Sequence, residues 1–210
     1  MAYGFLDIAA TPSVRAAQAA MGAARNWEDF KGDRAFDRLT PDVSAFIAAR
    51  DSLYMATVSE TGWPYVQHRG GPAGFLHVLD DRTLAFADYR GNRQYISVGN
   101  LAANDRASLI LVDYPARARL KMYVRVEAVS LEADPALAAR VAVPGYAAKA
   151  ERTLLLHLEA FDWNCRQHIV PRFTQAEIAA AVAPLRDRLA ALEAENAALR
   201  ARLPAEDGVG

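Results

Sequence analysis

Hydrophobic and polar positions divide the chain into three parts that differ in period. The first 39 residues are rich in alanine and contain Thr11 followed by Pro12, a typical helix start, so they predict a helical arm that packs on the main body. Thr40 followed by Pro41 repeats this signal and predicts another helix, whose apolar stripe is Val43, Phe46 and Ile47.

Residues 52–161 show the alternation that is typical of β-strands. Tight turns are predicted at Glu60-Thr61-Gly62 and at Asp80-Asp81-Arg82, where they join successive strands into hairpins. The predicted strands are residues 53–59, 63–69, 75–79, 83–87, 106–114, 121–131 and 152–161. Because short strands joined by hairpins favour antiparallel pairing, we expect a mainly β (α+β) fold, an antiparallel barrel with flanking helices. Three glycines interrupt the second strand, as expected for a bulge or a close approach of the backbone to a ligand: Gly70, Gly71 and Gly74.

A polar corner, defined here as residues 88–97, follows the strand 83–87. The chain is expected to turn at Gly91 and to begin a helix directly afterwards. Free backbone N–H groups, a positive helix end and a guanidinium together suit a phosphate monoester. A capped helix with a solvated arginine is the alternative. The predicted phosphate-binding residues of the corner are Asn92, Arg93, Gln94 and Ser97.

The C-terminal part begins with Thr174-Gln175-Ala176-Glu177, a capping box that predicts a helix start. Two series of positions recur every seven residues behind it: Leu185, Leu192 and Leu199, and Leu189, Asn196 and Leu203. This heptad pattern, with an asparagine at an a position, favours a parallel two-stranded pairing between chains. Pro184 can kink the helix or begin a second one, and a helix packed on its own barrel is the alternative. Residues 173–183 contain no Lys or Arg, which excludes the basic region of a DNA-binding zipper.

Length and composition limit the classes of function. The 210 residues suffice for one domain with extensions: a helical arm (1–39), a barrel domain (40–173) and a C-terminal helix with a disordered tail (174–210). A net charge of −1 gives no general attraction to nucleic acid or to an anionic membrane. No apolar run approaches the roughly 20 residues of a membrane span. The single cysteine, Cys165, excludes an intrachain disulfide and favours a reducing compartment, so we expect a cytoplasmic protein.

Three stretches of sequence are distinctive: residues 62–71 (GWPYVQHRGG), 86–97 (FADYRGNRQYIS) and 162–169 (DWNCRQHI). In this order they resemble the pyridoxamine 5′-phosphate oxidase-like family of FMN-binding split barrels, and in particular its branch of predicted flavin-nucleotide-binding proteins. The similarity covers about residues 40–175. It implies an antiparallel Greek-key split β-barrel and a homodimer that holds FMN at the two-fold interface between subunits.

The resemblance also implies which residues contact the cofactor. The flavin ring and ribityl chain would run along Gln67, His68, Arg69 and Gly70. The strand beneath the ring would supply Ala87, Asp88 and Tyr89, and the phosphate would lie in the polar corner, which agrees with the pattern of that corner. Lys121 begins a strand that sends a side chain across the interface, and the partner subunit would bring Trp163 and Gln167 to the isoalloxazine.

No individual residue is a convincing general acid, general base or nucleophile. His68 on a strand is more typical of a packing residue than of a catalyst, and Cys165 is expected to be a buried spectator. Trp163 suits either the core or contact with the flavin ring. No metal site is predicted, because the other histidines lack the spacing of zinc ligands: His77, His157 and His168.

These observations predict an FMN-dependent oxidoreductase in which the cofactor carries the chemistry. Glycines and Gln94 stand where the oxidase itself has basic residues, so pyridoxamine phosphate is not the expected substrate. One alternative is a flavin carrier or sensor without turnover, whose C-terminal helix contacts a partner. Another is a split barrel that binds haem, with His68 or His168 as axial ligand, or a deazaflavin.

Overall fold

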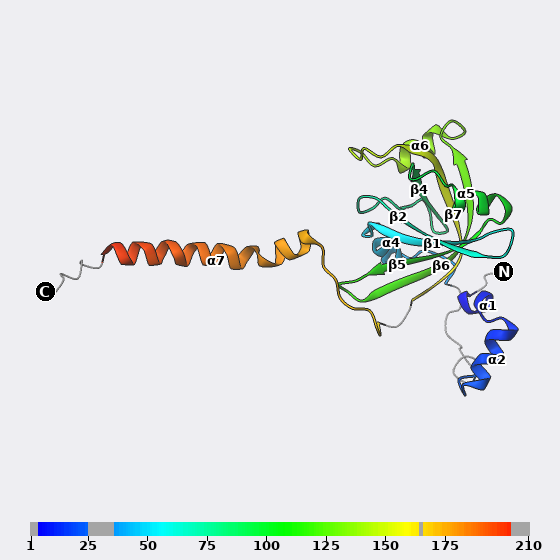
Figure 1. Cartoon of the computed structure of the whole chain (residues 1–210), viewed down its shortest axis with the longest axis horizontal. Coiled ribbons are helices and arrows are strands. Elements are labelled where there is room, and N and C mark those ends of the chain that lie inside the picture. The colour runs from blue at the N-terminus through cyan, green and yellow to red at the C-terminus, as the bar shows by residue number, and fades with distance from the viewer. Residues whose placement is uncertain (1–3, 25–35, 164–165, 203–210) are drawn as a thin grey trace. The chain divides into compact units, whose positions relative to one another are not determined.

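The computed structural model describes residues 4–24, 36–163 and 166–202, which form one antiparallel sheet with helices around it and a long C-terminal helix (Figure 1). The chain divides into two compact units, residues 1–169 and 170–210, and each is described by itself. No helix among the described residues is both long and apolar enough to cross a membrane.

The sheet has seven strands in the order β2-β1-β5-β6-β7-β4-β3, and every neighbouring pair is antiparallel. This topology, curled as Figure 1 shows, confirms the predicted split barrel. The two longest strands, β6 and β7, pair over most of their length with one bulge at Tyr123 and Val124. The strands are β1 (Ser52–Val58), β2 (Pro64–Gly70), β3 (His77–Val78), β4 (Thr83–Tyr89), β5 (Arg106–Asp113), β6 (Ala118–Ser130) and β7 (Ala150–Trp163).

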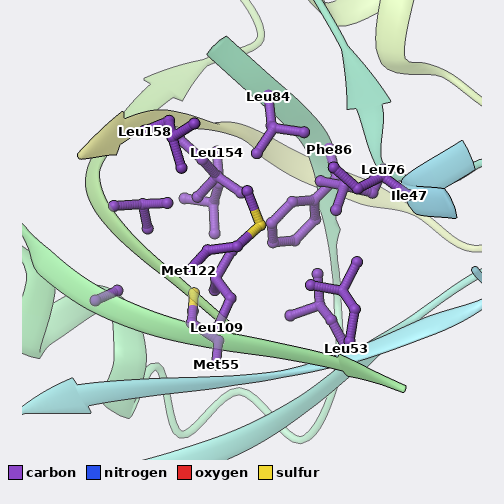
Figure 2. Close-up of a cluster of buried hydrophobic side chains, with 14 of the residues drawn as sticks. Ile47, Leu53, Met55, Leu76, Leu84, Phe86, Leu109, Met122, Leu154 and Leu158 are labelled. Atoms are coloured by element: carbon purple, nitrogen blue, oxygen red, sulfur yellow. The ribbon is translucent and has the colours of Figure 1, made fainter. Parts of the chain in front are cut away.

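The inner face of the sheet forms the core. Along β1 the buried positions alternate with open ones, so Leu53, Met55 and Thr57 point inward. Side chains from five strands meet there, together with Ile47 of helix α4 (Pro41–Ala48) (Figure 2). Burial of so many branched and aromatic side chains supplies the main driving force for folding, at about 1.5–3 kcal/mol for each fully buried one.

Strand β4 is buried on both faces. Leu84 and Phe86 face the main core, whereas Ala85 and Ala87 face outward against Val141 of helix α6 (Pro135–Val141). Alanine at these two positions leaves room for that helix to pack closely. The polar residues that follow β4 are therefore carried by one of the most completely buried strands of the fold.

Helix α5 (Ile96–Ala103) is fixed to the sheet by a buried hydrogen bond. Asn100 Nδ2 donates to Thr57 Oγ1 of β1 over 3.0 Å, and Leu101 packs into the core beside it. Since both polar side chains are buried, this bond satisfies groups that would otherwise be costly to remove from water. It thereby anchors α5, which directly follows the polar corner, to β1.

Several predicted boundaries differ from the structure. The predicted strand 75–79 is reduced to His77–Val78, because Phe75 and Leu76 turn into the core instead of pairing. The glycines after β2 do allow a close approach, but to the protein itself: a Cβ at Gly71 would lie 2.8 Å from the Cβ of Phe75. Packing against Phe75 is therefore enough to explain the glycine at position 71, and an approach of this backbone to a ligand stays a prediction.

The described part of the N-terminal arm contains the short helices α1 (Phe5–Ala9) and α2 (Pro12–Ala20). Thr11 caps α2 as predicted, but no residue of α2 is buried. The arm is fixed instead by Phe5, whose ring stacks on Tyr123 of β6 with centroids 4.6 Å apart. The expectation that the alanine-rich helix itself packs on the main body is thus wrong, since alanine offers it too little apolar surface.

The C-terminal unit contains helix α7 (Gln175–Arg202). Thr174 and Glu177 form the predicted capping box, with Glu177 N–H donating to Thr174 Oγ1 and Thr174 N–H donating to Glu177. The helix continues through Pro184, and none of its residues is buried. Leu203 of the predicted heptads lies outside the described residues.

Candidate functional site

A pocket of about 300 Å³ lies where β2 faces β4. In the sheet, β2 is at one edge and β4 is next to the other edge, and the two share no ladder among the described strands. They face each other because the sheet curls. The polar corner and the first turn of α5 close the pocket. Its lining residues are Tyr65, Gln67, His68, Arg69, Gly70, Phe86, Ala87, Asp88, Tyr89, Gly91, Asn92, Arg93, Gln94, Tyr95, Ile96, Ser97, Val98 and Glu151.

The structure brings together eleven of the fourteen predicted cofactor-binding residues in this one pocket. They come from stretches separated by some twenty residues in the sequence, and no strand pairing joins them directly. The eleven are Gln67, His68, Arg69, Gly70, Ala87, Asp88, Tyr89, Asn92, Arg93, Gln94 and Ser97.

Strand β2 supplies a polar wall. Its register pairs Tyr65, Gln67 and Arg69 with the inward residues of β1, so these side chains continue the inner face of the barrel beyond the core. Tyr65 Oη donates to Gln67 Oε1 over 2.5 Å, which orients the amide. His68 points to the other face of the strand, where its ring meets Tyr54 edge-on at 5.5 Å. Polar inward residues on an edge strand indicate a wall that faces a ligand rather than a core.

An ion pair bridges the two walls. Arg69 Nη1 lies 2.5 Å from Asp88 Oδ1, and Arg152 Nε lies 3.7 Å from the other oxygen of the same carboxylate. Asp88 is only 5% exposed. Burial raises the pKa of Asp88, and the guanidinium groups of Arg69 and Arg152 act in the opposite direction. Part of the charge of Arg69, which the sequence assigns to the cofactor, is therefore balanced inside the protein.

The polar corner holds two residues in the left-handed region, Arg93 with φ 64° and Tyr95 with φ 53°. Asn92 Oδ1 accepts a hydrogen bond from the backbone N–H of Gln94, which stabilises the turn. The helix consequently begins at Ile96 and not directly after Gly91, so the predicted start is wrong by several residues. Non-glycine residues in this conformation are uncommon and concentrate at functional sites.

Three features leave this corner ready to bind an anion. Tyr95 at the N-cap gives α5 no side-chain cap, and residues of its first turn line the pocket, so the N–H groups that a helix start leaves without intrahelical partners belong to this wall. Ser97 is 2% exposed, and its Oγ has no hydrogen-bond partner in the described protein. Arg93 forms no ion pair with any described residue, whereas the other guanidinium groups at the pocket are held by carboxylates. Buried polar atoms without partners are rare in proteins, and two of them among the described residues, Ser97 Oγ and Arg69 Nε, belong to residues that line this pocket.

The net charge of the pocket follows from these pairs. Arg90 Nε binds Glu151 Oε1 over 2.6 Å, and this hydrogen bond is the main reason that the pKa of Glu151 is lowered. Within the described residues, the carboxylates of Asp88 and Glu151 each form an ion pair with at least one arginine, whereas the charge of Arg93 is not balanced by any carboxylate. The pocket is therefore positive at the end nearest α5.

Sequence reasoning missed several lining residues. Tyr65 and Tyr95 stand inside the distinctive stretches, and the alternation of β2 could have identified Tyr65 as inward. Glu151 lines the pocket and Arg152 binds Asp88, but neither carries such a signal, since both stand near the start of β7, far away in the sequence. They reach the site because Asp88 and Tyr89 of β4 pair with Arg152 and Ala150.

Three predicted residues do not line the pocket of their own chain. The Lys121 ammonium lies 2.9 Å from Asp162 and 4.6 Å from the centre of the Phe5 ring, on the outer face of β6. Trp163 is 39% exposed and packs edge-on against Phe46 with centroids 4.8 Å apart. Gln167 is exposed. Their contact with a cofactor held by the partner subunit stays a prediction.

Among the described residues, no group of His, Asp and Glu side chains gathers closely enough to hold a metal ion. Cys165, which was expected to be a buried spectator, lies outside the described residues.

Comparison with known proteins places this site in context. No curated protein matches the chain. Similar solved structures include a Clostridium acetobutylicum protein of the pyridoxine phosphate oxidase family, 16% identical over 65% of this chain and 94% of that chain, with a TM-score of 0.44. They also include an FMN-binding protein from Syntrophomonas wolfei, 14% identical over 70% of this chain and 97% of that one, with a TM-score of 0.45. A third is the haem storage protein HutZ from Vibrio cholerae, 17% identical over 60% and 94%, with a TM-score of 0.40.

These likenesses concern the fold, whereas the family is shown by a direct match of sequence. The family model described as pyridoxamine 5′-phosphate oxidase matches residues 39–164, which is more than half of the chain and includes the whole barrel and the pocket. The resemblance stated from the sequence is thereby confirmed. The chain belongs to the pyridoxamine 5′-phosphate oxidase family.

Proposed function

We propose that this protein is an FMN-binding oxidoreductase whose phosphate site is the polar corner. The observation that carries the proposal is the convergence of the buried Ser97 hydroxyl, the Arg93 guanidinium and the uncapped first turn of α5 on one end of the pocket. A phosphate monoester accepts hydrogen bonds from all three kinds of donor at once. The donors present therefore fit the phosphate of FMN.

The rest of the pocket suits the remainder of the cofactor. Gln67 offers an amide that can bind the polar edge of a flavin ring, and Tyr65 fixes the orientation of that amide. The Arg69–Asp88 pair links β2 to β4 beside the space that the ligand would occupy. The Nε of Arg69 is buried without a partner in the described protein and is available to an acceptor on the ligand.

Bound FMN supplies hydride or single-electron transfer. The residues of this chain would bind and orient it, and a positive pocket end would favour negative charge on the cofactor. His68 lines the pocket, but its ring packs on Tyr54 at the other face of β2 and is not aimed at a reacting group. The chain thus offers binding and electrostatics, and the nature of the electron donor is left to whatever molecule meets the flavin.

A homodimer completes the proposal. The outward face of β1 and β2 and the turn between them, beside the pocket, expose apolar side chains that a single copy leaves in water: Tyr54 at 40%, Val58 at 38%, Trp63 at 77% and Val66 at 60%. Clustered apolar exposure of this kind is typical of a protein interface. A second copy docked near this face would be placed to bring its Trp163 and Gln167 toward the flavin, as the resemblance implies.

Arg93→Ala tests the phosphate site. The substitution removes one charge-assisted hydrogen bond, worth about 1.5–3 kcal/mol, so FMN affinity should fall more than tenfold in a fluorescence titration. Arg106→Ala is the matched control, because Arg106 is exposed, lines no part of this pocket and bonds only to Asn104 among described side chains. Equal affinity of the Arg93 variant and the wild type would contradict the proposal.

Absorption of the purified protein separates the wider alternatives. A flavin spectrum supports FMN, whereas a Soret band would indicate haem. If FMN binds, turnover with NADH or NADPH then distinguishes an oxidoreductase from a carrier without activity. Protein that is isolated colourless and stays colourless in excess FMN would end the proposal.

A further inference from the structure

Helix α7 carries a continuous apolar seam, defined here by positions that alternate four and three residues apart. Every residue at these positions except Asn196 is apolar, and the side chains are exposed to solvent: Leu185 is 70% exposed, Leu189 57% and Leu192 43%. A stripe at this spacing is the face by which α-helices pair. The seam consists of Ile178, Val182, Leu185, Leu189, Leu192, Asn196 and Leu199.

Pro184 does not divide the seam. The structure has one helix from Gln175 to Arg202, with the proline inside it. Pro184 stands two positions after Val182 and one before Leu185, which places it on the outer face next to the seam rather than within it. The seam therefore extends toward the N-terminus beyond the leucines, to Ile178.

We propose that this seam pairs with the same seam of a second copy of the chain, as a parallel, in-register, two-stranded coiled coil. The proposal is independent of the proposed cofactor, since no residue of α7 lines the pocket. Its support is the charge pattern beside the seam and the position of Asn196.

The flanking charges complement each other in a parallel pair. In that arrangement a residue just before an a position faces the residue five places later in the other helix. Arg188 then faces Glu193 of the second copy, and Glu195 faces Arg200 of the second copy. By symmetry each contact occurs twice, so four pairs of opposite charge flank the coil and none of like charge.

Asn196 decides between the two directions of pairing. The charges alone also fit an antiparallel alignment in which Arg188 faces Glu195 and Arg186 faces Glu193. That alignment would bury the Asn196 amide against Leu185, without a hydrogen-bond partner. The parallel alignment instead stacks Asn196 on its own copy, where the two amides bond to each other. In that pairing, a side chain of the facing helix would cover the shallow hollow on α7 that Leu189, Leu192, Asn196 and Arg200 help to line.

Cysteine cross-linking of the full chain tests the direction and register without depending on how the barrels associate. In a Cys165→Ser background, Leu199→Cys should give a disulfide-linked dimer under mild oxidation, because position 199 meets itself only in the parallel register. Ala198→Cys, which points away from the seam, is the matched control and should stay monomeric on a denaturing gel. No linked dimer from Leu199→Cys, or equal linkage of both variants, would overturn the proposal.

A second pair of variants tests the seam itself. Adding Leu192→Glu to the Leu199→Cys chain should abolish the linked dimer, because two carboxylates would meet at the centre of the coil. Adding Ala191→Glu places the same charge on the outer face and should leave linkage intact. FMN binding should be unchanged in both, so failure of the coil is distinguishable from failure of the flavin site. Linkage that survives Leu192→Glu would contradict pairing through this seam.

Discussion

The Ser97 hydroxyl is predicted to lower the stability of the ligand-free protein and to strengthen the binding of FMN. Its hydroxyl is buried at the wall of the pocket without a hydrogen-bond partner in the described protein, and it stands in the uncapped first turn of α5. If that hydroxyl exists to bind the phosphate of a ligand, the protein without ligand is destabilised by it. Ser97→Ala should then stabilise the ligand-free protein and weaken FMN binding.

Both magnitudes follow from the burial of Ser97. An unpaired hydroxyl in the interior costs between about 1 and 3 kcal/mol in proteins, so the free energy of unfolding should rise by an amount in that range without FMN. A hydrogen bond to a charged phosphate is worth about 1.5–3 kcal/mol, so affinity should fall roughly 10- to 150-fold. At saturating FMN the two effects largely cancel.

Urea unfolding with and without FMN, together with a fluorescence titration, measures both quantities. Thr153→Val is the matched control, because the Thr153 hydroxyl is also buried and unpartnered among described atoms but does not line the pocket. That variant should gain stability and keep its affinity for FMN. A Ser97→Ala protein that is less stable without ligand, or that binds FMN as tightly as the wild type, would refute the reasoning.

Two further predictions concern stability. Asn100→Ala should lower the free energy of unfolding by about 1–3 kcal/mol in urea, because it leaves the buried Thr57 hydroxyl without its partner; a smaller loss would mean that the bond does not fix α5. Burial, then the nearby charge of Arg140, lowers the pKa of His77 below 6.5. Protons therefore favour the unfolded state, and stability should be full above pH 6.5 and decline as the pH falls through the lowered pKa. His77→Gln should flatten that decline in unfolding curves recorded from pH 7.5 to 5; an equal slope would exclude His77 as its cause.

The strands were predictable because each depends on a local pattern. The alternation of β1 and the turn at Gly62 follow from a few adjacent residues, and both occur as predicted. The ends of elements were less predictable where tertiary packing decides them. Phe75 and Leu76 look like strand residues, yet the core draws them out of the ladder.

The site was predictable as a set of segments but not as a set of contacts. The motif around Arg93 predicted an anion-binding corner, and the structure gathers the residues of that corner into a pocket with β2. Nothing in the sequence shows that Asp88 forms an ion pair with Arg69, since the two residues belong to strands that do not pair. Nor does it show that Tyr95 delays the helix, because a left-handed residue there depends on the surrounding loop.

The lack of a hydrogen-bonded ladder between β2 and β4 explains why the pocket lies where it does. Backbone hydrogen bonds fix every neighbouring pair of strands, but β2 and β4 face each other without a ladder among the described strands, so only side chains define their separation. The Arg69–Asp88 pair is one such link, and its buried carboxylate carries a cost of desolvation. A ligand that contacts both walls would add a second link and bind the folded state alone. Stabilisation by FMN should therefore grow with the logarithm of its concentration above the dissociation constant, as for any ligand that binds the folded state alone.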